Sequence, residues 1–120
     1  MNPYELKTSY SSSKEYKFVE ISIDGLTDGQ KVSETISKIT ARFLTGYKCK
    51  VYKNENGDNS IIIQKKRNLF SRQKWIISTD IPNRPDIDTI NLALNPCNDQ
   101  SEVDLSRLVE KLMEELWLFK

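Results

Sequence analysis

Basic and aromatic side chains gather between Lys65 and Trp75, in the sequence KKRNLFSRQKW. Its five lysines and arginines surround the apolar pair Leu69-Phe70. Lysine and arginine neutralise phosphate oxygens, and an aromatic ring can stack on a base or enter a lipid interface. Two large apolar residues at a loop tip also suit a pocket on a protein partner, or can fold back onto their own domain. The stretch therefore predicts contact with an anionic surface or with protein, and leaves the folded-back arrangement open.

The groups that most often carry catalysis are missing or badly placed. The chain has no histidine, which removes the most usual general base, the usual triad partner and the commonest metal ligand. Cys49 falls within an expected strand on its buried face, and Cys97 follows Pro96 without an activating base nearby in the sequence. The two cysteines also lack a CxxC spacing, so we expect reduced thiols. We therefore expect a protein that is not an enzyme.

No loop has the pattern of a cofactor or metal site. The aspartate-containing segment 80–88, DIPNRPDID, lacks the D-x-D-x-D-G spacing of a calcium loop, and its prolines indicate a rigid connection. The four glycines cannot form the phosphate-binding patterns GxGxxG or GxxxxGK. We expect no cofactor and no bound metal.

Charge is distributed unevenly along the chain, although its net value is only +1. Residues 45–79 contain 8 basic and 2 acidic residues, whereas residues 80–120 contain 4 basic and 9 acidic ones. Such a division is typical of a localised anionic partner or of self-association between opposite patches. The alternative is that the two regions neutralise each other within the fold.

The periodicity predicts which elements position these side chains. Residues 1–15 are polar and serine-rich, and we expect a flexible or loosely docked arm, followed by one domain over residues 16–120. Alternation from Tyr16 predicts a strand that buries Val19, Ile21 and Ile23 and ends at Gly25. A capping box, Thr27 to Gln30, then begins a helix that ends near Gly46. Further strands are expected over Tyr47–Lys53, Ser60–Lys66, Lys74–Ile81 and Thr89–Asn95, with a hairpin turn at Asn56-Gly57 and a last helix capped by Ser101.

This order, β-α-β-β-β-β-α, predicts an α+β fold: an antiparallel sheet of five strands with both helices packed on one face. In topology it resembles one half of the TATA-box-binding-protein fold, or a reduced helix-grip domain, over residues 16–119. The resemblance is architectural, rests on no family motif, and implies no function.

The sheet face away from the helices is expected to be both apolar and basic. Alternation assigns it Phe18, Lys48, Lys50, Tyr52, Ile62, Gln64, Lys66, Lys74 and Ile76. A solvated antiparallel face would be more uniformly polar, so we expect this one to be covered, by a second subunit or the N-terminal arm in preference to nucleic acid.

These observations favour a non-enzymatic binding or assembly module that acts through protein–protein contact and self-associates. The alternative is nucleic-acid or anionic-lipid binding through the basic hairpin. We expect cytoplasmic localisation, since no apolar run is long enough to span a bilayer and the first residues lack the apolar core of a signal peptide. The predicted partner-binding residues are Lys48, Lys50, Ile62, Lys66, Arg67, Leu69, Phe70, Arg72 and Lys74.

Overall fold

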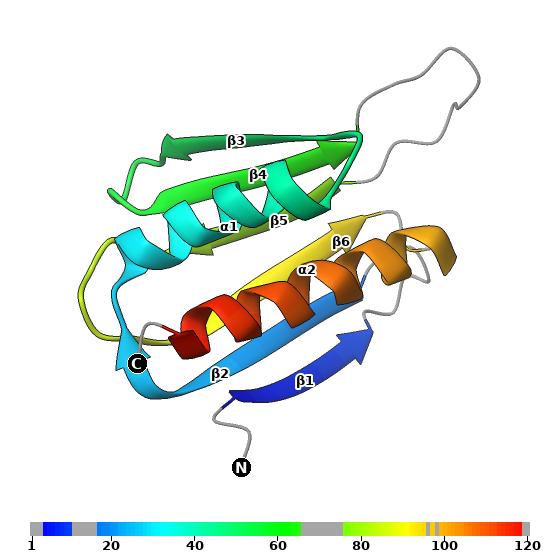
Figure 1. The fold of residues 1–120 in the computed structure, drawn as a ribbon. Helices are drawn as coiled ribbons and strands as arrows, with labels where there is room; N and C mark the ends of the chain where they lie inside the picture. Colours follow the sequence, from blue (N-terminus) through cyan, green and yellow to red (C-terminus); the bar gives the residue numbers. More distant parts are fainter. Residues whose placement is uncertain (1–3, 11–16, 66–75, 96, 98, 119–120) are drawn as a thin grey trace.

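A computed structural model describes residues 4–10, 17–65, 76–95, 97 and 99–118. These residues form one antiparallel sheet of six strands with two helices on one of its faces (Figure 1). The strands, in their order across the sheet, are β1 (Tyr4–Tyr10), β2 (Lys17–Thr27), β6 (Ile87–Asn95), β5 (Ile76–Ile81), β4 (Asn59–Lys65) and β3 (Tyr47–Lys53). The helices are α1 (Gly29–Phe43) and α2 (Asp99–Leu118). The predicted α+β class, with antiparallel strands and both helices on one face, is confirmed.

Strand β1 is the principal difference from the expected order. It lies in the segment predicted as a loose arm, and it pairs with β2 from Tyr4 opposite Ile23 to Tyr10 opposite Lys17. The sequence YELKTSY does alternate larger and polar residues, but the serines and lysine that follow it obscured this short signal. The sheet therefore has six strands in place of the predicted five.

The core lies between the sheet and the helices. Each central strand contributes alternate residues that are almost fully buried, as the period of two predicts. Helices α1 and α2 add residues at three- and four-residue steps. The largest fully buried side chains are Ile21, Ile36, Ile39, Ile61, Ile63, Ile77, Ile81, Ile87, Ile90, Leu92, Leu94 and Leu105.

Both helix starts differ from the expected caps. Asp28 caps α1, and its carboxylate accepts hydrogen bonds from the backbone N–H groups of Gln30 (2.7 Å) and Lys31 (3.3 Å). Thr27 is instead the last residue of β2. Helix α2 begins at Asp99, so Ser101 is buried within its first turn and is not the cap. In each case a neighbouring aspartate marks the helix start, because its carboxylate favours the positive end of the helix dipole.

The corner between β2 and α1 is tightly packed. Strand β2 continues past Gly25 through a register irregularity, where Leu26 adopts a positive φ of 55°. The backbone N–H of Gly29 then donates to the carbonyl of Arg84 at 2.9 Å. A Cβ atom at position 29 would lie 1.9 Å from the carbonyl oxygen of Pro82, so only glycine allows α1 to approach the loop after β5 this closely.

A side-chain hydrogen bond also connects helix α2 to β3, the strand at one edge of the sheet. The buried hydroxyl of Tyr47, on β3, donates to Asp104 Oδ2 at 2.5 Å.

None of the helices in the described part of the chain is long and apolar enough to cross a membrane.

Candidate functional site

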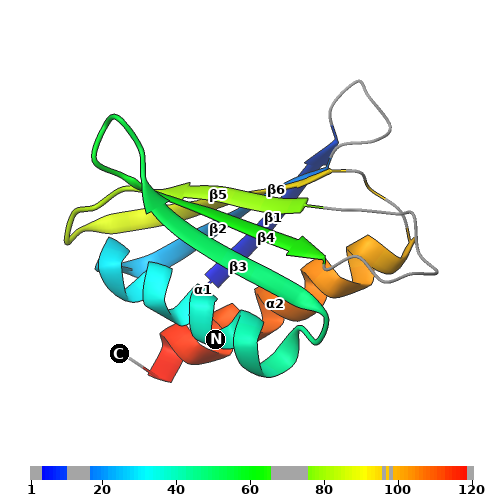
Figure 2. The ribbon, with the colours of Figure 1, turned by 90° about the horizontal axis from the view of Figure 1, so that it is seen from above.

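The sheet face opposite the two helices, called here the open face, is covered by no helix or strand of the described residues (Figure 2). Strand β3 shows which residues belong to it. The Cys49 Sγ atom lies 3.7 Å from Ser37 Oγ on α1, so Cys49 faces the helices and its neighbours Lys48 and Lys50 face the other way. In the described residues the open face therefore carries the predicted apolar and basic side chains, and it also carries the carboxylates of Glu20 and Asp80, which were not predicted to lie on it.

Strand register aligns the open-face residues into rows across the sheet. In the central row, Phe18 on β2 pairs with Ala93 on β6, Ala93 with Ser78 on β5, and Ser78 with Ile62 on β4. Lys50 on β3 continues this row beyond Ile62. In this row, the large side chains of Phe18 and Ile62 thus flank the small ones of Ala93 and Ser78.

A second row, the polar row, lies one step further along the strands. Glu20 pairs with Asn91 across β2 and β6, and Asp80 pairs with Ser60 across β5 and β4. Tyr52 on β3 pairs with Ser60. Two carboxylates and an amide therefore lie beside the apolar part of the face.

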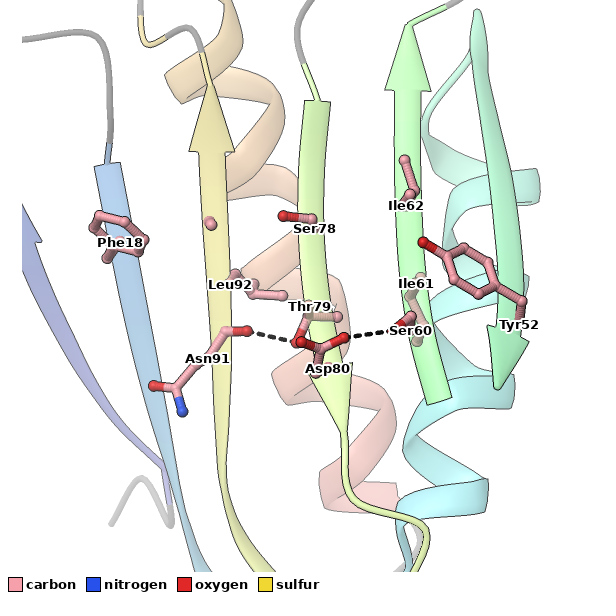
Figure 3. Close-up of a pocket in the computed structure, with 11 residues that line it drawn as sticks. Phe18, Tyr52, Ser60, Ile61, Ile62, Ser78, Thr79, Asp80, Asn91 and Leu92 are labelled. Carbon is pink, nitrogen blue, oxygen red and sulfur yellow. Dashed lines mark hydrogen bonds between the residues drawn. The ribbon is translucent and has the colours of Figure 1, made fainter. Parts of the chain in front are cut away.

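Between these residues the open face has a hollow of about 430 Å³. Figure 3 shows Phe18 on one side of it, Tyr52 and Ile62 on the other, and Ser78 between them. Residues of both rows line it, together with helix-facing residues of the same strands. The lining residues are Phe18, Tyr52, Ser60, Ile61, Ile62, Ser78, Thr79, Asp80, Asn91, Leu92 and Ala93. The hollow exists because the two central strands carry small residues where the flanking strands carry large ones.

Hydrogen bonds fix the polar end of the hollow. The Ser60 hydroxyl donates to Asp80 Oδ1 at 2.6 Å, and the Thr79 hydroxyl donates to the Asn91 carbonyl at 2.5 Å (Figure 3). Asp80 remains exposed to solvent. The Ser60 hydroxyl thus holds the Asp80 carboxylate at the polar end of the hollow.

The other group with possible chemistry, Cys97, is held as a neutral thiol. Burial raises the pKa of Cys97 to about 11, and the hydrogen bond from its Sγ to Glu102 Oε1, at 2.9 Å, adds to the effect. The same hydrogen bond lowers the pKa of Glu102, and Lys17 Nζ, 3.6 Å from Glu102 Oε2, lowers it further. A cysteine nucleophile needs a lowered thiol pKa, whereas that of Cys97 is raised. In the described residues, no three His, Cys, Asp or Glu side chains lie close enough together to hold a metal ion.

The structure places three of the nine predicted partner-binding residues. Lys50 and Ile62 are paired on adjacent strands of the open face, and Lys48 lies two positions along β3. Their roles in binding stay predictions. The other six lie outside the described residues: Lys66, Arg67, Leu69, Phe70, Arg72 and Lys74.

Sequence reasoning missed the middle of the site. Ser78 and Asp80 could have been found, because the predicted inward positions Ile77 and Thr79 leave the alternate residues of the same strand outside. Glu20 and Asn91 follow from the same alternation on β2 and β6. Only the pairing of β6 between β2 and β5 brings these four residues together, and that pairing is not a local signal.

A scan against protein-family models, a search of curated proteins and a search of solved structures each found no match. The likeness to half of the TATA-box-binding-protein fold or to a helix-grip domain therefore stays a prediction.

Proposed function

We propose that this protein is a non-enzymatic binding or assembly module that acts through protein–protein contact at its open face. The observation that carries the proposal is the apolar-walled hollow on an uncovered sheet face. Phe18, Tyr52 and Ile76 on this face are 43%, 51% and 37% exposed, respectively. An antiparallel face that only meets water normally alternates to polar residues, so large apolar side chains there favour a contact surface.

The energetic gain from covering the face is sufficient to matter. Burying a large apolar side chain completely is worth about 1.5–3 kcal/mol, so covering the exposed half of each of these three contributes roughly 1 kcal/mol apiece. Apolar anchors at the centre of a contact, surrounded by a polar rim, are the usual source of affinity between proteins. Here the rim is supplied by Lys48, Lys50 and the polar row.

The first experiment measures whether the partner is a second copy. If analytical ultracentrifugation shows that the wild-type protein forms an oligomer through the open face, the substitution Ile62→Asp should dissociate it, because it places a charge at the wall of the hollow. The matched control is Lys53→Asp, a charge change on the exposed edge strand outside the hollow. Far-UV circular dichroism and thermal unfolding check that both variants fold.

A monomeric wild-type protein would exclude self-association and direct the test to other proteins. A bound protein that wild type and Lys53→Asp both retain, and that Ile62→Asp loses, would support the proposed function. Equal retention by all three would contradict it.

A second candidate function, nucleic-acid binding, is favoured by the β3 side of the open face. Lys48 and Lys50 lie there beside the exposed ring of Tyr52, and their cross-strand neighbours Gln64 and Ile62 carry no negative charge. Lysines beside aromatic rings form the usual platform for single strands. The carboxylates of Glu20 and Asp80 on the same face oppose this function, which is why it ranks second.

Salt dependence separates the two functions. For nucleic-acid binding, fluorescence anisotropy with labelled oligothymidine should show affinity that falls steeply with salt, and Lys48→Glu with Lys50→Glu should weaken it further. Vesicles containing phosphatidylserine test the lipid version in the same buffers. Absence of binding to either probe at low salt would exclude this candidate.

A further inference from the structure

The hollow on the open face has the dimensions of a trough for one α-helix. Its floor is formed by Ser78 and Ala93 on the two central strands, and its walls by Phe18 on β2 and Ile62 on β4. Strands β2 and β4 are three strand spacings apart, roughly 14 Å. This separation of the two strand backbones is close to the diameter of a helix with its side chains, about 10–12 Å, so a helix can lie over the hollow with one row of its side chains between the walls.

A second sheet fits the same surface less well. Sheets pack face to face when both surfaces are evenly filled, whereas two copies of this face would place one hollow against the other and enclose a void. A helix is convex and can lower side chains onto the small floor residues. The two helices of this fold already run roughly along the strands on the opposite face, which shows the same packing direction in this sheet (Figure 1).

The charges at one end of the trough indicate what the helix should carry. Asp80 and Glu20 lie in the polar row, one step of two residues, or roughly 6.7 Å, from the central row. One helical turn from residue i to i+4 rises about 6 Å. An apolar side chain over Ser78 and Ala93 therefore places a lysine or arginine one turn away beside Asp80.

The helices of a second copy do not meet this requirement. The exposed residues of α1 are polar or charged apart from Ala41, and among residues 99–116 of α2 Val103 is the one large apolar side chain that is exposed, at 54%. Neither helix presents a second apolar stripe. Over the described side chains of the two helices, this favours an occupant from a different protein.

We infer that the open face receives an amphipathic helix of a partner protein, lying along β5 and β6, with apolar side chains over Ser78 and Ala93 and a basic residue beside Asp80. This inference rests on the proposed function and specifies its partner. The hollow spans the central row and the polar row, so the docked segment needs about two helical turns, or roughly 7 residues.

The test uses two yeast-displayed libraries sorted in parallel against the full-length wild-type protein. One library randomises the exposed face of a single helix on a helical scaffold, and the other randomises an extended segment. Enriched clones are then measured against Ser78→Leu and Ala93→Leu, which fill the trough. Ser22→Leu is the matched control, since Ser22 lies on the same face but not among the residues that line the hollow.

We expect the helical clones to bind wild type and Ser22→Leu equally and to lose at least tenfold in affinity for both trough-filling variants. We also expect them to carry lysine or arginine one turn from the apolar anchor, and to bind Asp80→Asn about fivefold more weakly. Circular dichroism establishes that each variant folds, and the use of two filling positions means that one misfolded variant does not decide the outcome.

Three results would overturn the inference. If only extended clones depend on Ser78, the face binds protein but not a helix, and the proposed function survives. If clones from neither library depend on Ser78 or Ile62, the proposed function fails as well. If Ser78→Leu instead abolishes oligothymidine binding or dissociates a wild-type dimer, the trough belongs to nucleic acid or to a second copy.

Discussion

The two faces of the sheet differ most clearly within one strand. On β5, Ile77, Thr79 and Ile81 face the helices and are buried to 6% exposure or less. Their neighbours Ile76, Ser78 and Asp80 face the other way and are half-buried or exposed. The helix-facing side chains of β5 are packed into the core, whereas the open face leaves Phe18, Tyr52 and Ile76 partly exposed to water. On this strand, stabilising burial is therefore concentrated on the helix-facing side.

The largest expected effect tests this division with two adjacent isoleucines. We expect Ile77→Ala to lower the free energy of unfolding by about 2–5 kcal/mol, because it leaves a cavity in the core. Ile76→Ala, on the open face, should lower it by less than about 1 kcal/mol. Urea unfolding followed by circular dichroism measures both. Similar losses in the two variants would mean that the faces do not differ in this way.

The alkylation rate of the Cys97 thiol, which packs against the core, measures how well the helix side excludes water. Since burial and Glu102 raise the pKa of Cys97 to about 11 from 9.0, alkylation by iodoacetamide at pH 8 should be roughly a hundredfold slower than for an unperturbed thiol. The measurement uses Cys49→Ser protein with a cysteine peptide as reference, and Glu102→Gln should restore part of the rate. Because the folded pKa is the higher one, the stabilising contribution of the neutral thiol is present below pH 9 and is lost as pH rises towards 11. Alkylation as fast as in the peptide would contradict this.

Two tyrosines on β3 provide a third test. Tyr47→Phe removes the donor to the buried Asp104 and should lower the free energy of unfolding by about 1–3 kcal/mol. Tyr52→Phe, on the open face, should change it by no more than about 0.5 kcal/mol. Thermal and urea unfolding of both variants give the comparison. A neutral Tyr47→Phe would show that the link between β3 and α2 does not stabilise the fold.

The smallest change in unfolding free energy is expected for Ser78→Leu, the substitution that should change binding most. Ser78→Leu fills the hollow without disturbing the helix side, and we expect its unfolding free energy to stay within about 0.5 kcal/mol of wild type. The same substitution should abolish docking at the trough. A large loss of stability would mean that the open face contributes to the fold itself.

Local patterns predicted most of the fold. The alternation of Val19, Ile21 and Ile23, and of Ile90, Leu92 and Leu94, correctly identified the residues buried against the helices. The turn at Asn56-Gly57 was also correct, since Gly57 has a φ of 83° and β3 and β4 pair around it. These signals work because burial on one face of a strand or helix imposes a period that the sequence must keep.

Strand β1 and the site were less accessible to prediction, each for a physical reason. A short polar strand such as β1 has too few apolar residues to stand out from a loop, so it depends on β2 for its structure. The hollow depends on Ser78 and Ala93 being adjacent, and these lie on strands whose pairing is decided by the whole sheet. The basic stretch from Lys65 to Trp75, conspicuous as it is, lies mostly outside the described residues, and its role stays a prediction.

The position of β6 between β2 and β5 has a consequence for how the chain assembles. Strands β3, β4 and β5 can pair from neighbouring segments, and so can β1 with β2. The two parts join only when β6 pairs with β2, which brings Lys17 opposite Leu94. Closing so long a loop is slow, and it leaves the edges of β2 and β5 unpaired until β6 has been synthesised. During translation the chain therefore passes through two incomplete sheets, and this interval is when it is most exposed to aggregation.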